Sequence, residues 1–192
     1  IDFFNHDIEI LKHEIKNRNH DDTISGIIVQ LPLIEKEKTD EIVSLIVPEK
    51  DVDGLSGKGK FDSATATAIN WLLAGYNINL ENKKIALVGK GRLVGDPLYK
   101  MFKKSGLDVS TFVEGDSLDS LPEFDVIITA TGVPHLIKNE LVSPGTILVD
   151  AGTASEGGVL VGDIEESLHE REDLAALTPR IGGVGPMTVS VL

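Results

Sequence analysis

Ile85-Ala86-Leu87-Val88-Gly89-Lys90-Gly91-Arg92-Leu93-Val94-Gly95 is the stretch that decides the fold. A short apolar run typical of a strand leads into a glycine-rich turn, and the residues that follow have a helical pattern. A strand, a turn and a helix in that order place backbone N–H groups at a helix N-terminus, where they can bind a pyrophosphate. The spacing is Gly-x-Gly-x-x-x-Gly, one residue longer than the commonest dinucleotide fingerprint. A plain tight turn between strand and helix is the alternative.

The chain around this turn alternates apolar runs with segments of helix or loop. The pattern predicts strands over 84–88, 108–113, 125–130 and 146–150 and a helix over 98–104. Parallel strands need crossover connections of this kind. The sequence therefore predicts an α/β fold with a Rossmann-type, doubly wound parallel sheet, which runs near 159–161 and 174–177 would extend.

The first third of the chain has a different pattern. A helix is predicted over roughly 7–18 with Asp7 as its cap, another over 35–46, and a third over 64–75 that links two halves. Residues 26–31 are a β-branched run stopped by Pro32, typical of a strand buried on both faces. Gln30 ends this strand, where an amide is costly unless it is hydrogen-bonded or faces a site. Residues 48–59 contain too many turn formers for regular structure and are predicted to be a loop.

Composition excludes several classes of function. The chain has 18 basic and 31 acidic residues and a formal net charge of −13, which repels nucleic acid and anionic membranes alike. The absence of cysteine excludes disulfides, thiolate metal sites and a cysteine nucleophile, and the five histidines lack the spacing of a metal site. No stretch approaches the roughly 20 apolar residues of a membrane span. We expect a soluble, cytoplasmic protein without a metal.

Charged residues near the turn bear on the choice of cofactor. The second predicted strand ends near Glu114, which could accept a hydrogen bond from the adenosine ribose and so favours NAD over NADP. Lys90 and Arg92 lie in the turn itself and could instead pair with a 2′-phosphate. A solvated rim is the alternative for all three side chains.

Small residues follow the later strands. Thr131 and Gly132 come after the third strand and Thr153 after the fourth, where they would permit close approach of a ribose or nicotinamide. Tight turns without a ligand are the alternative. Residues 182–188 form a glycine-rich loop that could enclose a flat ring, with Thr188 as the cap of a terminal helix.

Four motifs in a fixed order carry a resemblance to a known family. They are Gly26-Ile27-Ile28-Val29-Gln30-Leu31-Pro32-Leu33, Lys50-Asp51-Val52-Asp53-Gly54, Val88-Gly89-x-x-x-x-Val94-Gly95-x-Pro97, and Thr178-Pro179 with residues 182–188. Together they resemble the bifunctional methylenetetrahydrofolate dehydrogenase/methenyltetrahydrofolate cyclohydrolase family, from about residue 8 to the C-terminus. The resemblance implies a homodimer with folate bound in a cleft between a catalytic domain and a Rossmann-type cofactor domain.

The family resemblance also implies a reaction and residue roles. Hydride passes from 5,10-methylenetetrahydrofolate to NAD or NADP, and water opens the methenyl product to 10-formyltetrahydrofolate. Gln30 would support a catalytic lysine, and Asp53 would hydrogen-bond the pterin. The implied substrate loop is Gly182, Gly183, Val184, Gly185 and Pro186, and the implied cofactor residues are Thr65, Gly89, Lys90, Gly91, Arg92, Val94 and Gly95. The expected division is a partial catalytic domain over 1–66, a cofactor domain over 67–177, and a segment over 178–192 that returns to the catalytic domain.

The sequence departs from the family pattern in several places. The catalytic lysine of the family, with a tyrosine four residues before it, belongs to a segment expected before Ile1. Ser63-Ala64-Thr65-Ala66 keeps only the threonine of a Pro-Cys-Thr-Pro loop, and Arg180-Ile181 replaces Val-Pro. Gly89-Lys90-Gly91 replaces Gly-Arg-Ser, and an ammonium is a poorer bidentate clamp than a guanidinium. The alternatives are a catalytically silent dinucleotide-binding module and a different Rossmann dehydrogenase.

Overall fold

The computed structural model describes residues 7–156 and 159–192 of the chain. The fold divides into two compact units, residues 1–64 with Leu192 and residues 65–191. Each unit is described by itself. The predicted division into 1–66, 67–177 and 178–192, with the last segment returning to the catalytic domain, stays a prediction.

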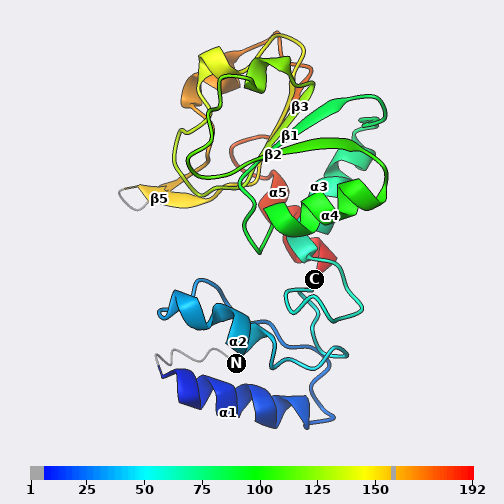
Figure 1. Cartoon of the computed structure of the whole chain (residues 1–192), viewed down its shortest axis with the longest axis vertical. Helices are drawn as coiled ribbons and strands as arrows, with labels where there is room; N and C mark the ends of the chain where they lie inside the picture. Colours follow the sequence, from blue (N-terminus) through cyan, green and yellow to red (C-terminus); the bar gives the residue numbers. More distant parts are fainter. Residues whose placement is uncertain (1–6, 157–158) are drawn as a thin grey trace. The chain divides into compact units, whose positions relative to one another are not determined.

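The second unit is built on a five-stranded parallel sheet (Figure 1). Its strands are β1 (Lys84–Val88), β2 (Asp108–Phe112), β3 (Val126–Thr129), β4 (Ile147–Asp150) and β7 (Ala176–Leu177), in the order β2-β1-β3-β4-β7. The register pairs Val88 with Phe112 and Thr129, and Thr129 with Asp150. The carboxyl ends of β1 to β4 therefore share one edge of the sheet. The predicted α/β fold and the predicted strands are confirmed.

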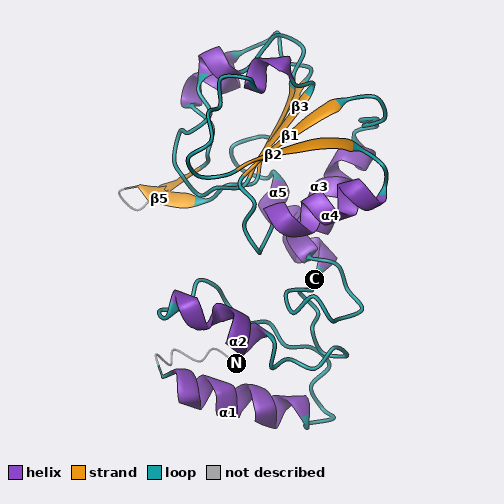
Figure 2. Ribbon diagram, in the orientation of Figure 1, coloured by secondary structure: helices purple, strands orange, loops and turns teal. Residues whose placement is uncertain are grey.

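Different elements cover the two faces of this sheet (Figure 2). The helices α3 (Ala64–Gly75), α4 (Gly95–Lys104) and α5 (Val184–Val191) pack on one face, with Ile69, Leu98, Phe102 and Val184 among the buried side chains. The opposite face is covered by loops and by the short 3-10 helices η2 (Leu121–Glu123), η3 (Asn139–Leu141) and η4 (Glu166–Glu170). Alternate side chains of each strand point to opposite faces of the sheet, so both faces present apolar side chains, and these covering elements bury them.

Two predictions about the C-terminal third are wrong. The run near 159–161 does not extend the sheet, because β5 (Ala154–Glu156) and β6 (Val159–Val161) form a separate antiparallel pair. Too few residues separate the two strands for a parallel crossover, so the strands pair antiparallel. Thr188 is not a helix cap, since α5 begins at Val184 and the Thr188 hydroxyl donates to the Val184 carbonyl at 3.1 Å. The run near 174–177 does extend the sheet, as predicted.

The first unit holds a small core between two helices. The helix α1 (Ile8–Asn19) begins as predicted, because the Asp7 carboxylate accepts from the N–H groups of Glu9 and Ile10 at 2.9 and 3.3 Å. The helix predicted over 35–46 is shorter and is preceded by a 3-10 turn: η1 spans Lys36–Lys38 and α2 spans Thr39–Val43. The buried side chains of this core are Ile15, Ile27, Val29, Ile42 and Ile46.

The prediction of a doubly buried strand over 26–31 is wrong. Ile27 makes one isolated bridge to Asp51, Ile28 is 51% exposed, and Gln30 is also exposed. The segment packs against the core on one side only, so its β-branched side chains alternate between core and solvent.

No helix in the described ranges is long and apolar enough to span a membrane.

Candidate cofactor and substrate site

The glycine turn brings the end of β1 against the start of α4. Gly89 has a φ of 92°, and its N–H donates to the Phe112 carbonyl at 2.8 Å. A Cβ on Gly89 would lie 2.6 Å from the Ala130 carbonyl oxygen, and a Cβ on Gly95 would overlap the carbonyl oxygen of Gly89. Gly91 has open space around it. Gly89 and Gly95 are therefore required, because the backbone comes too close for a side chain at either position. This close approach places the N-terminus of α4 against the turn.

The charged residues predicted near the cofactor are exposed. The Lys90 ammonium lies 4.3 Å from the centre of the Tyr99 ring, and this cation–π contact joins the turn to α4. Glu114 follows β2 in a turn where Gly115 has a φ of 94° and Asp116 accepts from the Val113 N–H at 2.8 Å. Because β2 pairs with β1, Glu114 lies on the edge that carries the glycine turn.

The ends of β3 and β4 are joined by carboxylates that the sequence reasoning missed. One oxygen of Asp163, Oδ2, accepts from the Thr129 hydroxyl and from the Thr131 N–H, both at 2.6 Å. A Cβ on Gly132 would lie 3.6 Å from the Thr153 carbonyl oxygen, so the predicted residues Thr131, Gly132 and Thr153 lie close together. The Gly162-Asp163 pair directly after an apolar run was the available sequence signal.

The loop before α5 is anchored to the same edge. The Asp150 N–H donates to the Thr178 hydroxyl oxygen at 2.9 Å. Of the predicted loop residues 182–188, only Gly182 and Gly183 precede α5, and Val184, Gly185 and Pro186 form its first turn, so the loop prediction is wrong from Val184 onward. Gly182, Gly185 and Pro186 are exposed, whereas Gly183 and Val184 are buried. The Val184 side chain belongs to the core of the second unit, so a ligand there would meet its backbone. Thr65 lies in the first turn of α3 and is partly buried, and Val94 is the N-cap of α4.

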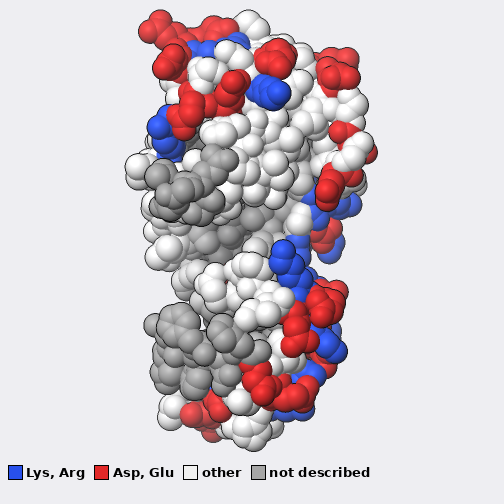
Figure 3. Space-filling view, turned by 90° about the vertical axis from the view of Figure 1, so that its left-hand side faces the viewer, with Lys and Arg blue, Asp and Glu red and all other residues white. Residues whose placement is uncertain are grey.

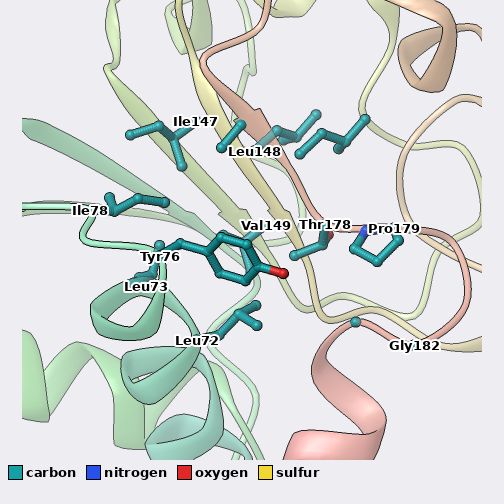
Figure 4. Close-up of a pocket in the computed structure, with 13 residues that line it drawn as sticks. Leu72, Leu73, Tyr76, Ile78, Ile147, Leu148, Val149, Thr178, Pro179 and Gly182 are labelled. Atoms are coloured by element: carbon teal, nitrogen blue, oxygen red, sulfur yellow. The ribbon is translucent and has the colours of Figure 1, made fainter.

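An apolar cavity of about 210 Å³ adjoins this loop (Figure 4). Its walls come from the end of α3, from β4 and β7, and from Thr178, Pro179, Gly182 and Gly183. The Tyr76 ring points into it, and the phenol oxygen faces Thr178 and Pro179 (Figure 4). The segment that leads into α5 therefore borders a cavity through Gly182 and Gly183.

The motif Lys50-Asp51-Val52-Asp53-Gly54 is fixed within the first unit by hydrogen bonds of its lysine and its first aspartate. The Lys50 ammonium donates to the carbonyls of Arg18, Asn19 and Asp21 at 2.8, 2.9 and 2.8 Å. Asp51 is fully buried and accepts from the Leu55 and Ser56 N–H groups, and those contacts were not predicted. They hold the loop that presents Asp53.

Gln30 lies in the segment beside this motif. The Ile27 N–H donates to the Lys50 carbonyl at 2.8 Å, which brings the two segments together. The exposed Gln30 amide donates to the Leu31 carbonyl at 3.1 Å, so the expected buried and costly amide is not observed. Its side chain remains accessible to a partner.

Asp53 gives the first unit a defined pH dependence. Burial raises the pKa of the Asp53 carboxyl above its ordinary value of 3.8, and the nearby Asp51 raises it further. The folded state then binds this proton more tightly than the unfolded chain, so stability is lost as the pH rises from 3.8 through the raised folded pKa. We expect the stability of Asp53→Asn relative to wild type to increase in urea unfolding as the pH is raised from 3.8, because asparagine does not ionise.

The exposed Asp22→Asn is the control for this comparison. A difference between Asp53→Asn and wild type that is constant with pH would contradict the assignment.

The surface carries charges of both signs. Figure 3 shows acidic and basic side chains interspersed on the face it presents, consistent with the net charge of −13. Within residues 7–156 and 159–192, no group of three or more His, Cys, Asp or Glu side chains has an arrangement that could hold a metal ion.

A parallel sheet whose first strand enters a glycine turn at a helix N-terminus defines a Rossmann-type dinucleotide-binding domain, here joined to a second, smaller unit. The family described as "Tetrahydrofolate dehydrogenase/cyclohydrolase, NAD(P)-binding domain" matches residues 63–192, and its catalytic-domain counterpart matches residues 5–53. The chain belongs to the tetrahydrofolate dehydrogenase/cyclohydrolase family.

Individual relatives agree with this assignment. The bifunctional protein FolD of Hydrogenobaculum sp. is 36% identical, and the match covers 100% of this chain and 74% of the relative. The Aquifex aeolicus FolD is 37% identical, with 91% and 64% covered. The crystal structure of the Campylobacter jejuni FolD dehydrogenase/cyclohydrolase has a TM-score of 0.86 at 34% identity, with 97% of this chain and 71% of that chain covered. The chain thus spans about two thirds to three quarters of these relatives.

Proposed function

We propose that this chain belongs to an NAD(P)-dependent methylenetetrahydrofolate dehydrogenase that also carries methenyltetrahydrofolate cyclohydrolase activity. The observation that carries the proposal is the glycine turn, where Gly95 has no room for a side chain, in a chain whose family is shown. The Trypanosoma brucei relative, at 29% identity and a TM-score of 0.86, was solved with NADP and an inhibitor.

The residues present suit a dinucleotide. The close approach at Gly89 and Gly95 leaves the N-terminus of α4 open to a pyrophosphate, and the cluster of Thr131, Gly132 and Thr153 would line the nicotinamide ribose. When bound, the oxidised nicotinamide supplies the hydride acceptor. Gly182, Gly183 and the first turn of α5 would hold the ring of the folate beside it. The proposed role of Asp53 is to accept a hydrogen bond from the pterin.

The cyclohydrolase step needs a group that handles the proton of the attacking water. The family lysine has no counterpart in the motifs of this chain, and Gln30 is proposed to orient it in the intact protein. Gln30 is accessible for this role because its side chain is exposed. The homodimer implied by the family stays a prediction.

A dehydrogenase assay tests the proposed function. The intact protein, given methylenetetrahydrofolate and either NAD+ or NADP+, should produce the near-ultraviolet absorbance of the reduced cofactor. An intact protein that binds dinucleotide but reduces neither cofactor would support the silent dinucleotide-binding module instead. Failure to bind either dinucleotide would refute both.

The cofactor preference is a separate prediction. We expect tighter binding of NAD+ than of NADP+, because Glu114 would accept from a ribose 2′-hydroxyl and repel a 2′-phosphate. Glu114→Ser should shift the ratio of the two dissociation constants by about tenfold toward NADP+, the effect of one hydrogen bond to a charged group. Calorimetric titration measures both constants. Tighter NADP+ binding that Glu114→Ser leaves unchanged would contradict the preference.

A further inference from the structure

Two carboxylates, those of Asp150 and Asp163, flank the antiparallel pair of β5 and β6. Asp150 ends β4 just before this pair, and Asp163 follows β6 just after it. Asp163 is fully buried, and Asp150 is partly buried. A buried carboxylate is costly unless donors surround it, so the donors that each one has indicate what it holds in place.

Asp163 holds the end of β3. Its Oδ2 accepts from the Thr129 hydroxyl and the Thr131 N–H, both at 2.6 Å. Its Oδ1 has no hydrogen-bond partner among the residues that the structure describes. This oxygen lies against Gly152, where a Cβ would overlap it. Asp163 is thus bonded to the loop after β3 and packed directly against the loop after β4.

Asp150 makes the reciprocal contacts. Its carboxylate accepts from the N–H groups of Gly152 at 2.9 Å, Asp163 at 3.2 Å and Ile164 at 3.3 Å. A Cβ on Gly162 would overlap Asp150 Oδ2, so this glycine is required in the same way as Gly152. The Asp163 carboxylate therefore fills the space beside Gly152, close to Asp150 in the sequence, and the Asp150 carboxylate fills the space beside Gly162, next to Asp163. The two loops and the segment after β6 are fixed as one assembly.

We propose that Asp163 is a positioning residue for the nicotinamide half of the cofactor site, an inference that rests on the proposed function. It acts through the backbone of Thr131 and Gly132 and through the Gly152–Thr153 segment, and does not touch the cofactor itself. Loops that line a ligand need their geometry fixed before binding, because misplacement by about 1 Å can cost two orders of magnitude in rate. The Asp163 side chain supplies that constraint through its short hydrogen bonds from the Thr129 hydroxyl and the Thr131 N–H.

The test compares Asp163→Ala and Asp163→Asn in the full chain by calorimetric titration with NAD+ and NADP+. Asp163→Ala removes the acceptor for Thr129 and Thr131 and should weaken binding of the preferred dinucleotide roughly tenfold or more. Asp163→Asn keeps one acceptor oxygen and should stay within about threefold of wild type. The matched control is Asp125→Ala, since Asp125 Oδ2 accepts from the Lys84 N–H at 2.8 Å at the opposite edge of the sheet. It should leave cofactor affinity unchanged.

Amide hydrogen exchange separates this inference from the proposed function. In Asp163→Ala, exchange at Thr131 should accelerate, whether or not the dinucleotide binds. If Asp163→Ala does not fold, Thr129→Val replaces it, because it deletes one donor and keeps the shape; it should weaken binding about threefold.

Wild-type chain that binds no dinucleotide would refute the proposed function, and the exchange data would then decide the loop geometry. Folded Asp163→Ala with wild-type affinity, or with wild-type exchange at Thr131, would overturn the positioning role. Equal losses in Asp163→Ala and Asp125→Ala would also overturn it, because they would show a general loss of stability.

Discussion

Gly95→Ala is expected to abolish dinucleotide binding and to destabilise the second unit by about 3 kcal/mol or more. A Cβ at this position would overlap the carbonyl oxygen of Gly89 and would also crowd the Lys90 backbone. Neither obstacle is the flexible end of a side chain, so the start of α4 has to move away from β1. The N-terminus of the helix would then no longer face the site where a pyrophosphate would lie. Urea unfolding and calorimetric titration with NAD+ and NADP+ measure the two effects.

Gly91→Ala is the matched control within the same turn. Nothing lies within 4 Å of a Cβ at Gly91, and its backbone is not in the left-handed region. This variant should keep its stability within about 0.5 kcal/mol of wild type, as expected for an exposed position without special contacts. Equal effects of the two substitutions would contradict the assignment of Gly95 as the residue that sets the approach of helix to strand.

Lys50→Met should destabilise the first unit by about 2–4 kcal/mol. The Lys50 ammonium donates three hydrogen bonds to carbonyls at the end of α1 and in the turn after it. Two of these carbonyls also accept from a backbone N–H: Arg18 from Asp21 at 3.3 Å, and Asp21 from Ile24 at 3.0 Å. Methionine has a similar length but donates nothing, so all three carbonyls would lose the ammonium as a donor. We expect the α1 peptides to exchange amide hydrogens faster and Asp53 to lose its fixed position.

Lys60→Met is the control for this substitution, because Lys60 is an exposed lysine near the same loop. It should change neither hydrogen exchange in α1 nor the affinity of the intact protein for folate. Unchanged protection of α1 in Lys50→Met would contradict the anchoring role of Lys50.

The sheet of the second unit could be predicted because its signals are local. β1, β3 and β4 are continuous apolar runs, and Gly89 and Gly95 lie where the strand and helix meet. Helix α3 was predicted with its bounds because its apolar periodicity coincides with the covered face. Strand pairing is less local: residues 159–161 have the composition of a sheet strand, but the short connection to β5 decides their partner.

The contacts that the sequence did not reveal are made between distant residues. Asp163 and Thr129 are 34 positions apart, and Lys50 and Arg18 are 32 apart, so neither pair leaves a periodic pattern. The run over 26–31 is another case, since its composition is that of a buried strand while its packing is one-sided. Propensity describes what a segment can form, and tertiary contacts decide which face is covered.

The central claim is that this chain carries the dinucleotide site of a methylenetetrahydrofolate dehydrogenase, and the most direct test is hydride transfer by the intact protein. Wild type should reduce NAD+ or NADP+ when methylenetetrahydrofolate is added, and Gly95→Ala should not. Absence of folate-dependent reduction in a wild-type protein that is folded and binds dinucleotide would contradict the claim.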